Sequence, residues 1–116
     1  PASYVGLLTD AAGKPTLLAS AKRHGRQLNV KLLQPIVVPQ GQVAVLWAVP
    51  QTGGSPFVVG LLPSAGTATT VRLTGSAEAV FFNVSHLGVS IEPGGATGRD
   101  APSGSFLLLG HCVKLW

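Results

Sequence analysis

The sequence predicts an all-β domain, an antiparallel β-sandwich of about eight short strands that is immunoglobulin-like in its general architecture. Two observations predict this fold class. The 15 glycines and 9 prolines are spread almost evenly along the 116 residues and separate runs of strand length. Within those runs apolar residues alternate or are continuous, and none with a helical period is long enough to predict a helix of several turns. At this length residues 1–116 form a single domain.

The first three expected strands, Tyr4–Leu8, Thr16–Ala21 and Gln27–Leu33, form a meander. A turn signal at 10–15 separates the first two, and a basic turn around Gly25 precedes the third. In the third run apolar residues stand at every second position, which is typical of a strand with one solvated face.

Residues 34–42 form a connector, because Pro35 and Pro39 exclude a central strand. Its segment 36–38 is apolar and is expected to cover the edge of the core. Val43–Val49 and Phe57–Leu62 then flank a Gly/Pro-rich turn and are expected to form a hairpin. Both runs are almost continuously apolar, as in strands that are buried on two faces or covered by a partner.

Thr67–Leu73 is a β-branched run and predicts the next strand. Residues 74–85 are ambiguous: a helical turn capped by Ser76 and a strand that includes Phe81 both fit them. We expect a short turn or loop that leads into a strand. Leu87–Ile91 and Phe106–Leu109 complete the set of strands.

Composition excludes several classes of function. Charged residues make up 10 % of the chain, against about 25 % in ordinary soluble domains, and no apolar run reaches the roughly 18 residues of a membrane helix. The net charge is +4, and the cations are concentrated in Lys22, Arg23, Arg26 and Lys31. A solvated turn is the simplest interpretation of this cluster, and contact with anionic lipid headgroups is the alternative. Aromatic residues are not interleaved with these cations, so we expect no nucleic-acid binding.

The sequence offers little for catalysis. Gly88–Glu92 contains a serine but lacks the second glycine of a nucleophile elbow. The three histidines are scattered and the four acids lie on different connections, which argues against a paired-carboxylate or metal-dependent enzyme. Cys112 is the only cysteine and is interpreted as a small apolar residue in or beside the last strand, or as a dimer cross-link if it is exposed. We therefore expect no enzyme activity, metal or cofactor.

A charged residue, Glu92, ends one of the best strands and is followed by Pro93, Gly94 and Gly95. We expect its carboxylate to accept the backbone N–H groups of Gly94, Gly95 and Ala96, and so to anchor the following loop rather than bind a ligand.

Two further residues stand out within the expected strands. Trp47 is predicted to fill the core between the sheets, where its indole N–H needs a partner, rather than to stack on a sugar. Gly60 indicates a bulge or a close backbone approach.

Three strings together resemble the C-terminal, extracytoplasmic domain of anti-sigma-K factors of the RskA type. They are LWAVP at 46–50, GLLP at 60–63 and VSIEPGGA at 89–96, followed by APSG at 101–104 and a closing glycine at 110. Arg99 and Asp100 depart from the small polar residues expected there. The residues that carry the resemblance are Trp47, Pro50, Gly60, Glu92, Pro93, Gly94, Gly95, Pro102 and Gly110.

The resemblance implies a regulatory domain on the extracytoplasmic, periplasmic face of a bacterial membrane protein. The whole protein would carry a cytoplasmic helical domain that binds an extracytoplasmic-function sigma factor, and one membrane helix, both absent from this chain. Such an anti-sigma factor is a sigma-factor antagonist in transcription regulation and signal transduction. It releases its partner through site-specific proteases, by regulated intramembrane proteolysis. The low surface charge and open strand edges are compatible with a homodimer. The alternative is a secreted β-sandwich module that binds carbohydrate or protein.

Overall fold

The predicted fold class is confirmed by a computed structural model, which describes residues 1–95 and 101–116. The described part of the chain contains eight strands and one short helix. Their bounds are β1 Tyr4–Thr9, β2 Pro15–Ala21, β3 Gln27–Leu32, β4 Gln42–Pro50, β5 Phe57–Leu62, β6 Ala68–Arg72, α1 Ala77–Phe81, β7 Val84–Pro93 and β8 Leu108–Lys114.

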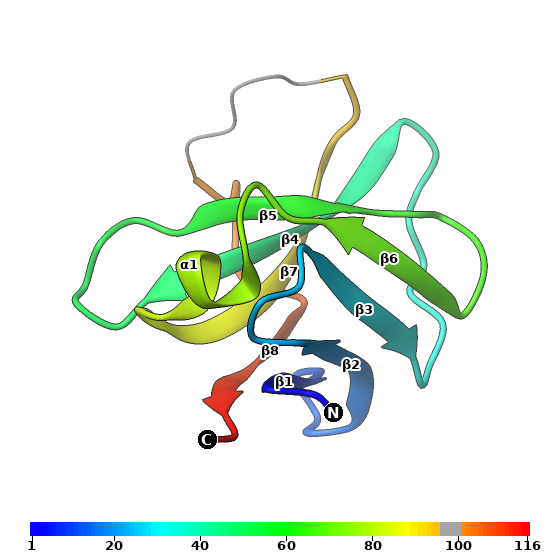
Figure 1. Ribbon diagram of the computed structural model, residues 1–116. Helices are drawn as coiled ribbons and strands as arrows, with labels where there is room; N and C mark the ends of the chain where they lie inside the picture. The colour runs from blue at the N-terminus through cyan, green and yellow to red at the C-terminus, as the bar shows by residue number, and fades with distance from the viewer. Residues whose placement is uncertain (96–100) are drawn as a thin grey trace.

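All eight strands belong to one antiparallel sheet with the order β5-β4-β7-β8-β1-β2-β3-β6. The predicted β1–β2–β3 meander and β4–β5 hairpin are both present. The sheet bends back on itself, so that β4 and β5 lie across the upper part of Figure 1 and β1, β2 and β8 lie below them. The two edge strands also meet, because a Cβ on Gly60 of β5 would overlap Cγ1 of Val71 on β6. The result is a nearly closed, barrel-like sandwich.

The main core fills the space inside this bent sheet. Alternate residues of each strand point inward, as the period of two requires. The members of this core include Tyr4, Leu8, Leu17, Leu28, Val30, Leu46, Phe81, Leu87, Val89 and Leu108. Ile36 and Val38 of the long connector pack against it, as expected for a segment at the core edge, whereas Val37 is 83 % exposed.

The two strongly apolar runs have different environments. β4 is buried on both faces from Ala44 to Ala48, which agrees with its continuous apolar sequence. β5 is an edge strand, and three of its apolar side chains, Phe57, Val58 and Leu61, are exposed.

The structure resolves the ambiguity of residues 74–85 in favour of the helical turn. Residues 77–81 form a one-turn helix whose N-cap is Ser76, with its Oγ accepting a hydrogen bond from Ala79 N at 3.2 Å. This turn places the Phe81 ring 5.7 Å from the ring of Tyr4, and β7 starts only at Val84.

The last strand was predicted at Phe106–Leu109, and these bounds were wrong. β8 runs on to Lys114 because it pairs with β1, for example Cys112 with Gly6, and this pairing extends the sheet.

Candidate functional site

A chain of buried polar side chains links β4, β7 and the connection before β8. Trp47 Nε1–H donates to Ser90 Oγ at 2.8 Å, and Ser90 Oγ–H donates to Glu92 Oε2 at 2.6 Å. The backbone N–H of Ser103 donates to the same carboxylate oxygen at 3.1 Å. Trp47, Ser90 and Glu92 are 0, 1 and 4 % exposed, so these bonds replace the water that each polar group lost on burial.

Strand pairing explains why these side chains meet. Ser90 and Glu92 are two residues apart on β7 and therefore share one face of the sheet. On the neighbouring strand, Val45 pairs with Ser90 and Trp47 pairs with Gly88, so the indole lies on the same face. Sequence alternation thus places Trp47, Ser90 and Glu92 together, but it gives no signal for Ser103, which comes from a distant turn.

Trp47 is buried as predicted, but it is not in the space between the two halves of the sheet. The neighbouring residue Leu46 belongs to the main core, and Trp47 points to the opposite, outward face of β4. There Phe106 covers the outer surface of Gly88, the partner of Trp47: a Cβ on Gly88 would lie 2.7 Å from the Phe106 ring. Phe106, just before β8, therefore covers a second, small core.

Glu92 does anchor its loop, although not through all the donors that the sequence indicated. The N–H of Gly94 donates to the carbonyl of Gly41 at 2.7 Å instead of to Glu92, because Gln42 and Pro93 are paired and bring these backbones together. Ala96 lies outside the described residues. The carboxylate takes Ser90 and Ser103 as donors.

The remaining motif residues lie at strand ends, in loops or where strands pack closely. Pro50 and Pro93 end β4 and β7, Pro102 is half-buried beside Ser103, and Gly95 has a φ of 74°, which favours glycine. Gly60 lies beside a register shift in the β4–β5 ladder, which agrees with the expected bulge, and its close neighbour is the Val71 side chain rather than another backbone. A Cβ on Gly110 would overlap the carbonyl oxygen of Leu7, and β8 can approach β1 there only with glycine.

The four cations of the predicted membrane contact are not gathered in one place. Lys22, Arg23 and Arg26 lie at the β2–β3 turn, whereas Lys31 is at the other end of β3, paired with Leu18 and Ala68. Arg23 Nε is 2.7 Å from Glu78 Oε2, and its guanidinium stacks 4.7 Å from the Trp116 ring centre. Arg26 Nη2 donates to the Thr74 carbonyl at 3.2 Å.

Two histidines that are far apart in sequence meet across β7 and β8. His86 pairs with His111, and their ring centres are 4.3 Å apart. Burial lowers the pKa of His86 below 6.5, and the charge of the neighbouring His111 is a second, smaller cause in the same direction. The described residues contain no group of three or more His, Cys, Asp or Glu side chains placed to hold a metal ion.

Cys112 lies in β8 on the inward side of the strand and packs against the main core. Burial raises the pKa of its thiol to about 11. The position agrees with its interpretation as a small apolar residue of the last strand.

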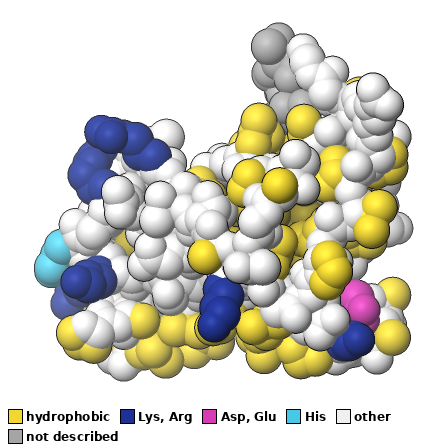
Figure 2. All heavy atoms as spheres, turned by 90° about the vertical axis from the view of Figure 1, so that its right-hand side faces the viewer, with side chains coloured by type: hydrophobic (Ala, Val, Ile, Leu, Met, Phe, Trp, Pro, Cys, Tyr) yellow, Lys and Arg dark blue, Asp and Glu magenta, His cyan; other side chains and the backbone are white. Residues whose placement is uncertain are grey.

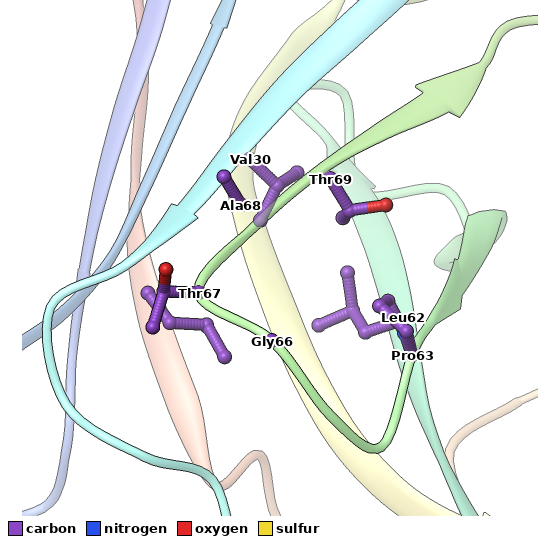
Figure 3. A pocket seen from close by; sticks show the side chains of 8 residues that line it. Val30, Leu62, Pro63, Gly66, Thr67, Ala68 and Thr69 are labelled. Atoms are coloured by element: carbon purple, nitrogen blue, oxygen red, sulfur yellow. The ribbon is translucent and has the colours of Figure 1, made fainter.

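A small hollow between β3 and the β5–β6 connection is apolar. Its lining includes Val30, Leu62, Pro63 and Ala68. Figure 3 shows the carbon side chains around it, and the oxygen atoms drawn there belong to threonine hydroxyls. Its lining offers no acid or base for catalysis.

The geometry therefore defines an all-β domain whose sequence motif is structural: the motif residues end strands, allow strands to approach and hold the backbone at Ser103. A family model described as "Anti-sigma-K factor rskA, C-terminal" matches residues 1–106. The chain belongs to this family, and it is an anti-sigma factor C-terminal domain. The match also includes the first forty residues, where the three sequence strings gave little signal.

Neither the curated proteins nor the solved structures provide a significant match to this chain. Within residues 1–95 and 101–116, no helix has the length and apolar character needed to cross a membrane.

Proposed function

We propose that this domain is the extracytoplasmic regulatory part of a membrane-anchored anti-sigma factor, and that it controls release of an extracytoplasmic-function sigma factor through regulated proteolysis. The observation that carries the proposal is the family match over residues 1–106. In this proposal a cytoplasmic domain holds the sigma factor, a membrane helix connects the two sides, and the domain described here acts without catalysis.

The position of β1 supports a protective role for the folded state. β1 is an interior strand, paired with β2 on one side and β8 on the other. Ser3 continues both ladders: its N–H donates to Ala21 at 2.9 Å, and its carbonyl accepts from Leu115 N at 2.8 Å. A protease needs an accessible, extended segment, so cleavage from Ser3 onward requires the sheet to open. We infer that loss of the fold is what exposes the adjoining chain to proteases.

The buried polar chain supports the same view. Trp47, Ser90 and Glu92 hydrogen-bond to one another or to the backbone inside the domain. These residues therefore act on stability, and a domain of this kind transmits a signal through whether it is folded. Destabilising variants are expected to release the sigma factor without any signal.

The experiment is to co-express the full-length protein with the sigma factor encoded beside it and to test whether the two co-purify. The sigma factor is expected in the eluate. If the protein is instead a secreted binding module, the sigma factor will be absent from the eluate. In cells, Glu92→Ala is expected to increase both the cleaved fragment on an immunoblot and sigma-dependent transcription. Glu78→Gln is the matched control, because it removes an acid from a surface pair rather than from the interior. Failure to co-purify, or equal effects of the two variants, would overturn the proposal.

A further inference from the structure

The outward face of β8, β1 and β2 is an exposed apolar surface. Val5 pairs with Val113 and Leu7 pairs with Leu18, while Leu109 lies opposite Thr9. Because side chains alternate along a strand, these apolar residues all point away from the main core. We call Val5, Leu7, Leu18, Leu109 and Val113 the outer apolar face.

This face is accessible to a partner. Leu7, Leu109 and Val113 are 45, 42 and 46 % exposed, and the other two side chains are half-buried. Figure 2 shows hydrophobic side chains gathered along the lower edge of the molecule, the side on which Figure 1 places β1, β2 and β8. Exposed apolar side chains that lie next to one another on a sheet indicate an interaction surface, whereas single scattered ones need no such explanation.

Cations surround the outer apolar face. Lys31 is the cross-strand neighbour of Leu18 on the same face. Lys14 precedes β2 and Lys22 follows it. Lys114 does not belong to this group, because it pairs with the inward-facing Tyr4 and its Nζ lies 4.4 Å from the centre of the Trp116 ring. Figure 2 also shows Lys or Arg side chains among and beside the hydrophobic ones at this edge.

Few acidic side chains are available near this face in the described part of the chain. Glu92 is buried, and Glu78 is paired with Arg23. Asp10, at the β1–β2 turn, uses Oδ1 to accept the backbone N–H groups of Ala12 and Lys14. The surroundings of the apolar face are therefore positively charged overall.

We propose that the outer apolar face docks on the surface of an anionic lipid bilayer. The leucine and valine side chains enter the headgroup boundary, and the surrounding lysines bind anionic headgroups, which is the pattern of interfacial membrane binding. A second copy of the chain is a poorer occupant, because two such faces in contact would bring their lysines together. In the arrangement proposed above, a membrane helix would also keep this domain near a bilayer, but lipid docking stands on the surface itself.

The test is flotation of the 116-residue chain with vesicles of phosphatidylcholine, with or without phosphatidylglycerol. The chain is expected to float with the phosphatidylglycerol vesicles at about 0.1 M salt and to be largely released at about 1 M, where charges are screened over a few ångströms. Equal binding to both kinds of vesicle, or no binding to either, would overturn the proposal.

Variants distinguish vesicle binding through this face from nonspecific adsorption of the protein. Leu7→Thr combined with Leu109→Thr keeps β-forming residues and is expected to weaken vesicle binding about ten-fold or more. The control Leu61→Thr changes a leucine on β5 that is 53 % exposed, more than Leu7 or Leu109, and is expected to leave binding unchanged. Lys31→Gln is expected to weaken binding about five-fold. Arg72→Gln, an exposed cation at the other end of β6, should have a smaller effect.

Other outcomes count against the proposal. If Arg72→Gln matches Lys31→Gln, net charge rather than this face attracts the vesicle. If light scattering detects a dimer that Leu7→Thr dissociates, and vesicles do not bind, the occupant is a second copy. Circular dichroism of each variant checks folding, and the exposed Lys31→Gln remains informative if the double variant unfolds. Sigma-factor co-purification does not depend on vesicle binding, so failure of either proposal is recognised separately.

Discussion

The ring of Phe106 occupies the space in which Gly88 would carry a side chain. A Cβ built on Gly88 lies 2.7 Å from Cδ1 and 2.8 Å from Cε1 of that ring. Gly88 is paired with Trp47, so this contact closes the small core outside the sheet. A glycine in the middle of a strand is thereby explained by what packs on it.

Gly88→Ala is expected to destabilise the domain by about 1–3 kcal/mol, because the Phe106 ring has to move out of a packed site. The free energy of unfolding in urea measures the change. Gly104→Ala is the control, since nothing lies within 4 Å of a Cβ there, and it should change stability by less than about 0.5 kcal/mol. Equal values for the two variants would contradict the assigned packing.

Glu92→Ala is expected to lower the free energy of unfolding by about 1–3 kcal/mol, because it leaves the buried Ser90 hydroxyl and the part-buried Ser103 N–H without this acceptor. Glu92→Gln keeps an acceptor oxygen but loses the charge and is expected to be destabilising within the same range. Glu78→Gln disrupts a pair whose side chains are 43 and 37 % exposed and should cost at most about 1 kcal/mol. An unchanged melting temperature in both Glu92 variants would refute this role.

Stability should fall as the solution is acidified through the titration of His86. Its Ser85 neighbour donates Oγ–H to the Val49 carbonyl at 3.1 Å, so the ring Nδ1–H donates to Ser85 Oγ at 2.9 Å. Burial and His111 lower the folded-state pKa of His86, and the unfolded chain therefore binds more protons just below pH 6.5. The contribution of His86 is complete above that pH and is lost as the pH falls toward the folded-state pKa.

Urea unfolding at a series of pH values between about 7.5 and 5.5 measures this effect. His86→Gln is expected to flatten the dependence of stability on pH. His24→Gln serves as the comparison because His24 is exposed at the β2–β3 turn, and it should leave the slope unchanged. The same slope in wild type and His86→Gln would show that other groups control the pH response.

Cys112 is expected to react slowly with thiol reagents in the folded domain. Burial raises its pKa from 9.0 to about 11, which reduces the thiolate fraction near neutral pH about 100-fold. Alkylation by iodoacetamide, followed by mass spectrometry, should be slow in buffer and fast in urea. Rapid formation of a disulfide-linked dimer under native conditions would contradict this.

The fold was largely readable from the sequence because its strands are short and separated by glycine and proline. Seven of the eight expected runs, such as Gln27–Leu33 and Phe57–Leu62, match observed strands within about three residues at each end. The end of the chain was harder, because His111–Lys114 gains strand structure from pairing with β1, and that pairing has no local signal. Phe81 was also ambiguous, since its place is set by packing against Tyr4.

The candidate site was predictable only in part. Glu92 was identified because a carboxylate at the end of an apolar strand needs donors. Its partner Ser90 follows from the period of two, whereas Ser103 comes from a turn eleven residues away and had no signal. The outer apolar face was not found from the sequence, because it forms only when β8 is placed beside β1.

The pairing of β1 with β8 joins the first and last strands of the domain, and this has a consequence for how it forms. An interior strand made by residues 4–9 cannot complete its ladders until residues 108–114 have left the ribosome. Long-range pairing of this kind makes folding slow and strongly dependent on chain topology. During synthesis the N-terminal meander therefore lacks the β8 partner of β1 until almost the entire domain has been made.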